Sequence, residues 1–287
     1  MKRIKLTVAY DGTNYSGWQI QPNASTIEAV LDEAIQQVTG ENIHVTGASR
    51  TDARVHALGN VAVFDTASTI PADRWAYVIN RFLPEDVSVV ESREVKPDFH
   101  PRHCNTLKTY EYKILSGTFP IPQLRNSAWH ITFSPDIKKM REAAKLLVGE
   151  HDFKSFCCVR TQVESTVRTI YSIDIIESPY LMLPSAADTQ NSAVNLPETD
   201  AGNNQKNISH RLITIRITGN GFLYNMVRII AGTLIQVGRG QLEVSDISEM
   251  LERKDRTAAG QTAPPQGLTL MNIKYVDNDD EKYNSCG

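Results

Sequence analysis

The stretch from Phe222 to Val237 limits the possible folds of this chain more than any other segment. Apolar residues occupy almost every side of the helix that its spacing predicts, and a helix of this kind is normally buried in a core. The stretch carries a charge at Arg228 and is shorter than the ~20 apolar residues that a membrane span needs. We therefore expect a globular fold whose core surrounds this helix.

A guanidinium inside such a helix has a large desolvation penalty unless an anion lies beside it. We therefore expect Arg228 to face a carboxylate or a phosphate, and Asp52 is a candidate partner. The alternative is an ion pair that serves only the architecture, which is the commoner case for an arbitrary buried arginine.

Asp52 lies in the sequence ASRTDARVHA, between Arg50 and Arg54. Strand patterns at His44–Ala48 and Val61–Phe64 place it on the connecting loop, and loops on rigid scaffolds commonly carry functional groups. Nearby cations favour the ionised form of a carboxylate, so we expect Asp52 to act as a nucleophile or a base rather than as an acid. The alternative is an aspartate that shapes a turn or caps a helix, as is common in loops.

Periodicity predicts helices and strands along most of the chain. Ile4–Tyr10 alternates like a half-buried strand, and a capping box at Ser25–Glu28 opens a helix that ends at Gly40. Further elements are expected as follows: helices at Asp73–Phe82, from about Pro135 (capped by Ser134 and stopped by Gly149) and at Asp246–Leu251, and strands at Val87–Val90, Tyr110–Leu115, Arg168–Ile176, Arg211–Thr218 and Leu268–Tyr275.

Strands grouped in sheets with helices on one face imply an α+β fold with two related lobes and a mainly antiparallel sheet. The polar segment Lys96–Thr109 contains two prolines, which predicts a crossing between lobes. We therefore expect an N-terminal lobe at residues 1–105 and a C-terminal lobe at 106–276. Residues 185–209 are polar and predict a flexible insertion, and residues 277–287 form an acidic tail.

Composition leaves the functional class open, because 41% hydrophobic and 22% charged residues are ordinary values for a soluble protein. The N-terminus lacks the uninterrupted apolar core of a signal peptide, so we expect a cytoplasmic protein with no membrane association. The net charge of -3 argues against a uniformly basic surface. The stretch Ser209–Gln241, with four arginines and no acid, could still form a local cleft for a phosphate backbone.

The four cysteines form no CxxC pair, and we expect them to be reduced thiols. A zinc site that uses His100, His103 and Cys104, with Cys157 and Cys158, is an alternative. Structural zinc usually draws on CxxC-type pairs, so we expect no metal.

Six motifs follow one another over nearly the whole chain. They are YDG..Y.GWQ.Q from Tyr10 to Gln21, RTDARVHA around Asp52, KTYEY around Tyr110, GEHDFKSF at Gly149–Phe156, GNGFLYNMVRIIAG at Gly219–Gly232 and KDRTAAGQTAPPQGLTL at Lys254–Leu270. Together they resemble the motifs of the tRNA pseudouridine synthase A family. Each motif is weak evidence alone, but six in the same order are strong evidence.

The resemblance implies a pseudouridine synthase fold and an isomerase that converts uridine to pseudouridine at positions 38, 39 and 40 in the anticodon stem-loop of tRNA. It also implies a homodimer with neither a metal nor an organic cofactor. Asp52 is then the nucleophile, Arg228 orients it, and Tyr110 stacks on a target base that has left the helix. The candidates for contacts with RNA phosphates are Arg50, Arg54, Lys108, Arg216 and Arg239.

The chain departs from the family pattern at Ser49 and Arg54, where the family motif has glycine. If either glycine adopts a positive φ or lets RNA approach closely, the larger residue is strained or blocks the substrate; Arg54 could instead add a phosphate contact. Two alternatives to a synthase follow: a catalytically inactive tRNA-binding protein, and a carboxylate-dependent hydrolase acting on nucleosides or RNA. The presence of Asp52, Tyr110 and Arg228 together favours the synthase.

Overall fold

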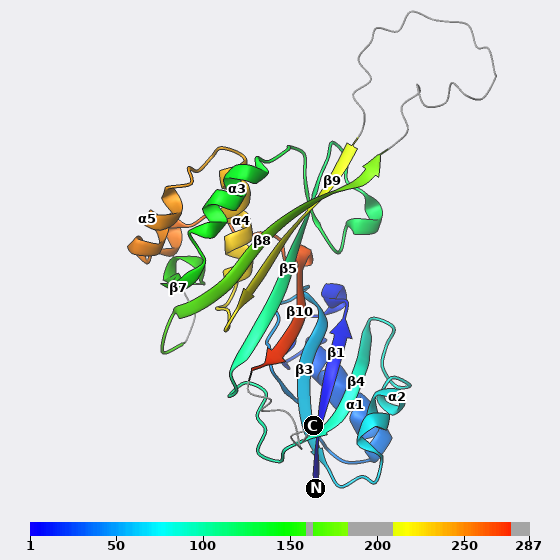
Figure 1. Cartoon of the computed structure of the whole chain (residues 1–287). Coiled ribbons are helices and arrows are strands. Elements are labelled where there is room, and N and C mark those ends of the chain that lie inside the picture. Colours follow the sequence, from blue (N-terminus) through cyan, green and yellow to red (C-terminus); the bar gives the residue numbers. More distant parts are fainter. Residues whose placement is uncertain (159–162, 183–208, 277–287) are drawn as a thin grey trace, which may run out of the picture.

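The computed structural model describes residues 1–158, 163–182 and 209–276. Within these ranges the strands form one ten-stranded sheet, and helices pack at both of its ends (Figure 1). The strand order is β4-β1-β3-β10-β5-β9-β8-β7, and β2 and β6 pair with β3 and β5 outside this path. Most neighbouring strands are antiparallel, which confirms the predicted α+β class with a mainly antiparallel sheet.

The elements of the described chain have the following bounds. The strands are β1 (Lys2–Tyr10), β2 (Thr46–Gly47), β3 (His56–Thr66), β4 (Val87–Val95), β5 (Thr106–Ser116), β6 (Trp129–Ile131), β7 (Gly149–Asp152), β8 (Val167–Met182), β9 (Ser209–Gly219) and β10 (Leu268–Tyr275). The helices are α1 (Ile27–Thr39), α2 (Trp75–Ile79), α3 (Ile137–Lys145), α4 (Met226–Gly238) and α5 (Asp246–Arg253).

Local signals set the ends of α1 with one difference from the prediction. Gly40 ends the helix in the left-handed conformation, with φ of 71°, as its lack of a Cβ favours. Thr26, not Ser25, is the N-cap, and its hydroxyl accepts a backbone N–H of the first turn at 3.4 Å. The predicted capping box is wrong because the Glu28 carboxylate instead accepts the backbone N–H of Ile20 at 3.0 Å.

The helix α3 is shorter than predicted at both ends. Asp136, not Ser134, is its N-cap, and the carboxylate accepts the backbone N–H of Lys139 at 3.0 Å. The Ser134 hydroxyl instead accepts a hydrogen bond from Arg211. At the other end Gly149 does not stop the helix but opens β7 with φ of 114°. The helix starts later than predicted because Asp136 takes the capping role expected of Ser134. At the other end, Gly149 belongs to the following strand and not to the end of the helix.

The last strand, β10, joins the two halves of the sheet. It lies between β3, from residues 1–105, and β5, from residues 106–276. Leu270 pairs in parallel with Ala57 on β3 and antiparallel with Tyr110 on β5. The loop that precedes β3 and the face of β5 that carries Tyr110 are therefore neighbours in space.

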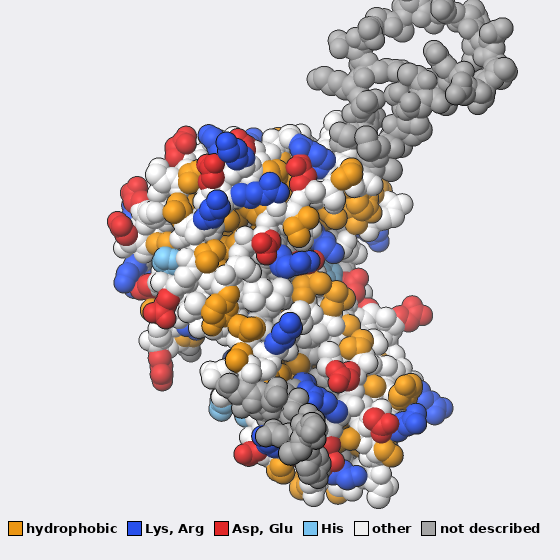
Figure 2. All heavy atoms as spheres, in the orientation of Figure 1, with side chains coloured by type: hydrophobic (Ala, Val, Ile, Leu, Met, Phe, Trp, Pro, Cys, Tyr) orange, Lys and Arg blue, Asp and Glu red, His pale blue; other side chains and the backbone are white. Residues whose placement is uncertain are grey.

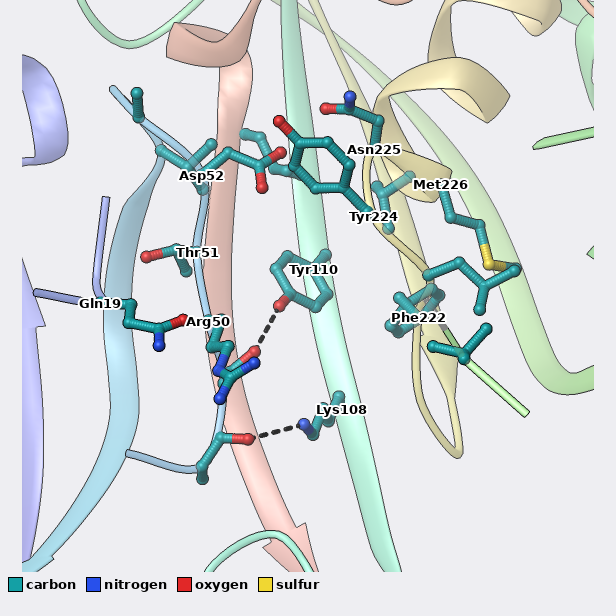
Figure 3. A pocket seen from close by; sticks show the side chains of 18 of the residues that line it. Gln19, Arg50, Thr51, Asp52, Lys108, Tyr110, Phe222, Tyr224, Asn225 and Met226 are labelled. Carbon is teal, nitrogen blue, oxygen red and sulfur yellow. Dashed lines mark hydrogen bonds between the residues drawn. The ribbon is translucent and has the colours of Figure 1, made fainter. Parts of the chain in front are cut away.

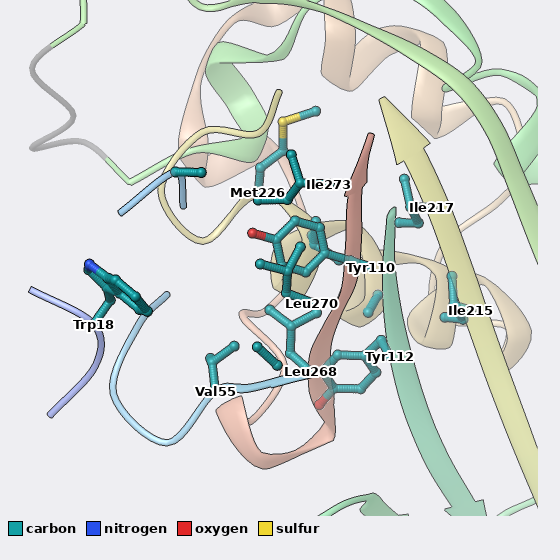
Figure 4. Close-up of a cluster of buried hydrophobic side chains, with 14 of the residues drawn as sticks. Trp18, Val55, Tyr110, Tyr112, Ile215, Ile217, Met226, Leu268, Leu270 and Ile273 are labelled. Atoms are coloured by element: carbon teal, nitrogen blue, oxygen red, sulfur yellow. The ribbon is translucent and has the colours of Figure 1, made fainter. Parts of the chain in front are cut away.

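Most of the core is one cluster of buried apolar side chains that extends from β1 to β10 (Figure 4), and a second, small cluster contains Val63, Val95 and Phe99. Trp18, Val55 and Leu268 belong to the large cluster, so this cluster runs beneath the junction of the two halves. The helix α4 is almost entirely buried in this cluster, as predicted, but it begins only at Met226; residues 222–225 precede it, and Tyr224 is exposed. In the described parts of the chain, no helix is long and apolar enough to cross a membrane.

Two predicted segments fall outside the described residues: the acidic tail at 277–287, and the insertion at 185–209 apart from its last residue, which begins β9. On the face of the molecule shown in Figure 2, basic and acidic side chains are interspersed. This face carries no continuous basic surface, as the net charge of -3 led us to expect.

Candidate active site

The loop between β2 and β3 carries Asp52 and rests on the segment Tyr10–Gln21. The backbone N–H of Trp18 donates a hydrogen bond to the Thr51 carbonyl at 3.0 Å. Gly17, with φ of 99°, permits this approach, because a Cβ on it would lie 2.6 Å from the Thr51 carbonyl oxygen. The first sequence motif therefore forms the platform on which the Asp52 loop is built.

Arg228 reaches Asp52 from the first turn of α4. Its Nη1 lies 3.4 Å from Asp52 Oδ2 and donates to Asn225 Oδ1 at 2.7 Å, and its Nε donates to the Ala263 carbonyl at 2.8 Å. Only 15% of the Arg228 side chain and 18% of the Asp52 side chain are exposed. Asp52 and Arg228, the two residues that the sequence singled out, are 176 positions apart in the chain and form an ion pair in the structure.

Burial raises the pKa of Asp52 above its ordinary value, and the charge and hydrogen bond of Arg228 lower it by less. Of the three arginines expected to favour the ionised form, Arg228 does so, whereas Arg50 and Arg54 are not among the causes of the shift. Among the residues that the structure describes, Arg228 is the cation paired with Asp52. A poorly solvated carboxylate forms a bond to carbon or to a proton more favourably than a well-solvated one. This environment therefore suits a nucleophile or a base.

A cleft of about 910 Å³ opens above Asp52, at the junction of the two halves (Figure 3). The Asp52 loop forms one wall, and β5 with the segment before α4 forms the other. Asp52, Tyr110 and Tyr224 point into the space between them. A concave site with a partly buried carboxylate and aromatic rings is suited to hold a planar, polar ligand.

Tyr110 lies on β5 with 7% of its surface exposed. Its hydroxyl and the Ser49 Oγ are 2.9 Å apart, and its ring meets the ring of Phe222 edge to face at 5.2 Å. Burial raises the pKa of Tyr110 to about 12, so the phenol stays protonated at neutral pH. Tyr110 is therefore a fixed aromatic wall of the cleft, close to Asp52 (Figure 3).

Two of the five predicted phosphate-binding residues, Arg50 and Lys108, line the cleft. Lys108 Nζ donates to the Ala48 carbonyl at 3.0 Å, and burial lowers its pKa to about 8. Arg102 and Arg168 also line the cleft, and our sequence reasoning missed them. Arg102 could have been suspected because it lies in the polar segment that crosses between the lobes. No local feature distinguishes Arg168 from any other charged residue at the start of a strand.

The other three predicted phosphate-binding residues do not line this cleft. Arg216 lies on the opposite face of the sheet from Tyr110, where it binds Glu111 at 2.6 and 2.9 Å. Arg239 lies after the C-terminus of α4, roughly 16 Å along the helix from Arg228, with its guanidinium 4.8 Å from the centre of the Phe133 ring. Arg54 is exposed on the outer side of the Asp52 loop.

The two departures from the family pattern have different structural consequences. Arg54 adopts the left-handed conformation, with φ of 64°, which glycine adopts without strain. This confirms that the position requires a positive φ. Ser49 has no positive φ and is therefore not strained; it lines the wall of the cleft, where it is buried and its hydroxyl contacts Tyr110.

In the possible zinc site, His100, His103 and Cys104 contact one another and do not point toward a common position for a metal ion. The rings of His100 and His103 stack with centres 3.8 Å apart, and Cys104 Sγ donates to the His100 carbonyl at 3.3 Å. Within residues 1–158, 163–182 and 209–276, no three His, Cys, Asp or Glu side chains form a group that could hold a metal ion.

Comparison with known proteins yields one consistent family. A family model described as tRNA pseudouridine synthase matches residues 6–103 and 143–276. A tRNA pseudouridine synthase A from Thermoanaerobacter sp. (strain X514) is 43% identical over 275 residues, which cover 96% of this chain and 100% of that protein. With the same coverage of both chains, proteins of that name from Ruminiclostridium cellulolyticum and Brevibacillus brevis are 42% and 40% identical.

Proposed function

Because this chain belongs to the tRNA pseudouridine synthase family, we propose that it isomerises uridine to pseudouridine at positions 38, 39 and 40 in the anticodon stem-loop of tRNA. The proposal of these positions follows from the resemblance to the A family and from relatives that carry its name. The same resemblance supports a homodimer that acts in the cytoplasm.

The proposed reaction exchanges one bond to the sugar for another. The N1–C1′ bond of uridine breaks, the uracil rotates, and a C5–C1′ bond forms. The proton on C5 leaves to solvent, and N1 gains a proton, so the product is an isomer of the substrate. No net oxidation or reduction occurs, and the reaction therefore requires no redox cofactor.

One observation carries the proposal: Asp52, which pairs with the mostly buried Arg228 at 3.4 Å, lines the cleft together with the ring of Tyr110. In the proposed mechanism Asp52 is the nucleophile, because it presents an oxygen to the space where a nucleotide can enter. Arg228 orients the carboxylate, and the guanidinium is itself held by two other acceptors, the Ala263 carbonyl and Asn225 Oδ1. Tyr110 stacks on the uracil.

The uracil must leave the tRNA stack before Asp52 can reach it, which costs a few kcal/mol. Contacts between RNA phosphates and the cations of the cleft offset this cost. We propose that Arg50 and Lys108 make such contacts together with Arg102 and Arg168, since all four line the cleft. Arg54 can add a contact only at the outer side of the loop, and the positions of Arg216 and Arg239 do not support a role in this cleft.

The test uses tRNA whose uridines carry tritium at C5. The purified protein is incubated with this tRNA, and both the release of label and the length of the strand are measured. Release of tritium with an intact strand supports the isomerase. Binding without release would identify an inactive tRNA-binding protein, and shortened or abasic tRNA would identify a hydrolase.

A control uses tRNA whose uridines 38, 39 and 40 are replaced by cytidine. It tests the proposed positions independently of the proposed activity. If label is still released at the full rate, the enzyme is a synthase but acts elsewhere, and the proposed positions are wrong.

A further inference from the structure

Asn60 on β3 lies behind the cleft and has no exposed surface. Its amide binds the backbone of Ser49 from both sides: Oδ1 accepts the N–H at 3.3 Å, and Nδ2 donates to the carbonyl at 3.0 Å. Oδ1 also accepts the N–H of Val61 at 2.9 Å, and Nδ2 also donates to the Tyr10 hydroxyl at 3.2 Å. The amide thus uses both of its donors and both of its acceptor positions.

These partners leave the Asn60 amide one orientation. Two backbone N–H groups, those of Ser49 and Val61, can only donate, so Oδ1 must face them. The Ser49 carbonyl can only accept, so Nδ2 must face it. Removing the amide would leave three buried backbone groups without these partners, and unpaired buried polar groups are strongly unfavourable.

The Tyr10 hydroxyl extends the network toward Asp52. Because it accepts from Asn60, its own proton is available for Thr51 Oγ1, which lies 2.7 Å away. The Thr51 carbonyl is held by the backbone of Trp18, as described above. The chain is therefore fixed at Ser49 and at Thr51, and Asp52 follows directly.

The Ser49 side chain extends the network in the other direction, to Tyr110. Its Oγ and the Tyr110 hydroxyl lie 2.9 Å apart, both in the buried part of the cleft wall (Figure 3). Ser49 is thus hydrogen-bonded to Asn60 through its backbone and to Tyr110 through its side chain. The loop that carries the nucleophile and the aromatic ring that carries the base are linked by a continuous chain of buried hydrogen bonds.

We propose that Asn60 and Ser49 are positioning residues, which set the distance and orientation between Asp52 and Tyr110. This inference rests on the proposed function, because it assigns the network a role in the chemical step of that reaction. Asn60 acts through the loop backbone and never touches the substrate. Ser49, at a position where the family motif has glycine, links the loop to the ring through its hydroxyl.

The first experiment compares Asn60→Ala with Asn80→Ala in steady-state kinetics with tritiated tRNA. Asn80 is a matched control because it clamps the backbone of Val89 in the same two-sided way, at 2.8 and 2.8 Å, on the outer strand β4. We expect Asn60→Ala to lower kcat by roughly 10- to 100-fold, as small displacements of reacting groups do. KM should stay within about threefold, because phosphate contacts dominate affinity. Asn80→Ala should lower Tm but leave kcat within about twofold.

The second experiment is a double-mutant cycle that does not depend on the folding of Asn60→Ala. Ser49→Ala removes one hydroxyl and keeps the buried backbone of the loop. We expect it to lower kcat by about three- to tenfold in the wild-type background and to have no further effect in a Tyr110→Phe background, where the partner hydroxyl is absent. Equal effects of Ser49→Ala in both backgrounds would overturn the link between Ser49 and Tyr110.

The outcomes separate this inference from the function on which it rests. If the wild-type chain binds tRNA but releases no tritium, the proposed function is wrong and the inference falls with it. If the wild type is active and Asn60→Ala behaves like Asn80→Ala, with lower Tm and unchanged kcat, the proposed function stands and the positioning role is refuted.

Discussion

Two sets of residues at the cleft are built in different ways, and each set draws on both walls. By their proposed roles, and not by their position, we call Asp52, Arg228 and Tyr110 the catalytic side, and Arg50, Arg102, Lys108 and Arg168 the basic side. On the catalytic side each side chain is mostly buried and has a defined partner. On the basic side the residues come from separate segments, and two of the four are exposed. Bond-forming chemistry requires fixed geometry, whereas a phosphate backbone can be held by several cations that each contribute independently.

The comparison predicts that substitutions on the catalytic side change turnover and that those on the basic side change affinity. The largest effect is expected from Asp52→Asn, which keeps the shape of the side chain but removes the proposed nucleophile. Turnover in the tritium-release assay should fall by on the order of 10⁴-fold or more. Affinity for tRNA, measured by filter binding, should stay within about tenfold. Normal turnover in this variant would contradict the assignment of Asp52.

Arg228→Lys is expected to lower kcat by about 10²-fold, because an ammonium cannot bind Asp52, Asn225 and the Ala263 carbonyl in the same fork. Arg228→Gln should also move the acid limb of the pH–rate profile to higher pH. Arg228 lowers the pKa of Asp52, so removing it raises that pKa further, and the active ionised form appears only at higher pH. An acid limb that stays in place in Arg228→Gln would show that a different group titrates.

On the basic side, Lys108→Ala should weaken tRNA binding and reduce the slope of log K against log salt by about 1, with kcat little changed at saturating tRNA. The pKa of Lys108 is lowered to about 8, so its charge is present at pH 7 and largely lost at pH 9. Affinity should therefore fall across this range, and Lys108→Arg should remove that part of the pH dependence. Arg216→Ala and Arg239→Ala are the matched controls, and we expect neither to change the slope.

The lowered pKa of Lys108 also has a consequence for stability. Because the pKa in the folded chain is below the ordinary value of 10.5, the unfolded chain binds more protons between pH 8 and 10.5. Stability should therefore rise with pH through this window in the wild type and less so in Lys108→Ala.

The smallest effect is expected at Arg54, on the edge of the catalytic side. Arg54→Gly removes a left-handed arginine, which costs about 1–2 kcal/mol, but adds the conformational freedom of glycine in the unfolded chain. Thermal unfolding should show a net gain of roughly 0.5 kcal/mol, with turnover unchanged. Arg50→Gly, at a position without positive φ, should lower stability, and a gain there would remove the strain argument.

Sequence reasoning singled out Asp52 and Arg228 because their signals are local, and it reached Tyr110 only through the resemblance to the family. An arginine in an apolar helix requires an anion wherever the helix packs, and the loop motif supplied one at Asp52. The class of fold and the burial of α4 followed from periodicity in the same way. The basic side was found only in part. The face of the sheet on which Arg216 lies depends on the register between β5 and β9, which sets Arg216 opposite Glu111.

The sequence by itself therefore determined which chemical groups the chain possesses, which helix is buried and which motifs stand in family order. The tertiary structure decided how those groups act. It brought Arg102 and Arg168 into the cleft, directed Arg216 and Arg239 away from it, and raised the pKa of Asp52 where neighbouring arginines had suggested the opposite. The physical reason is that electrostatic interactions and desolvation depend on distances and burial in space, and β10 sets both when it joins the two halves of the sheet.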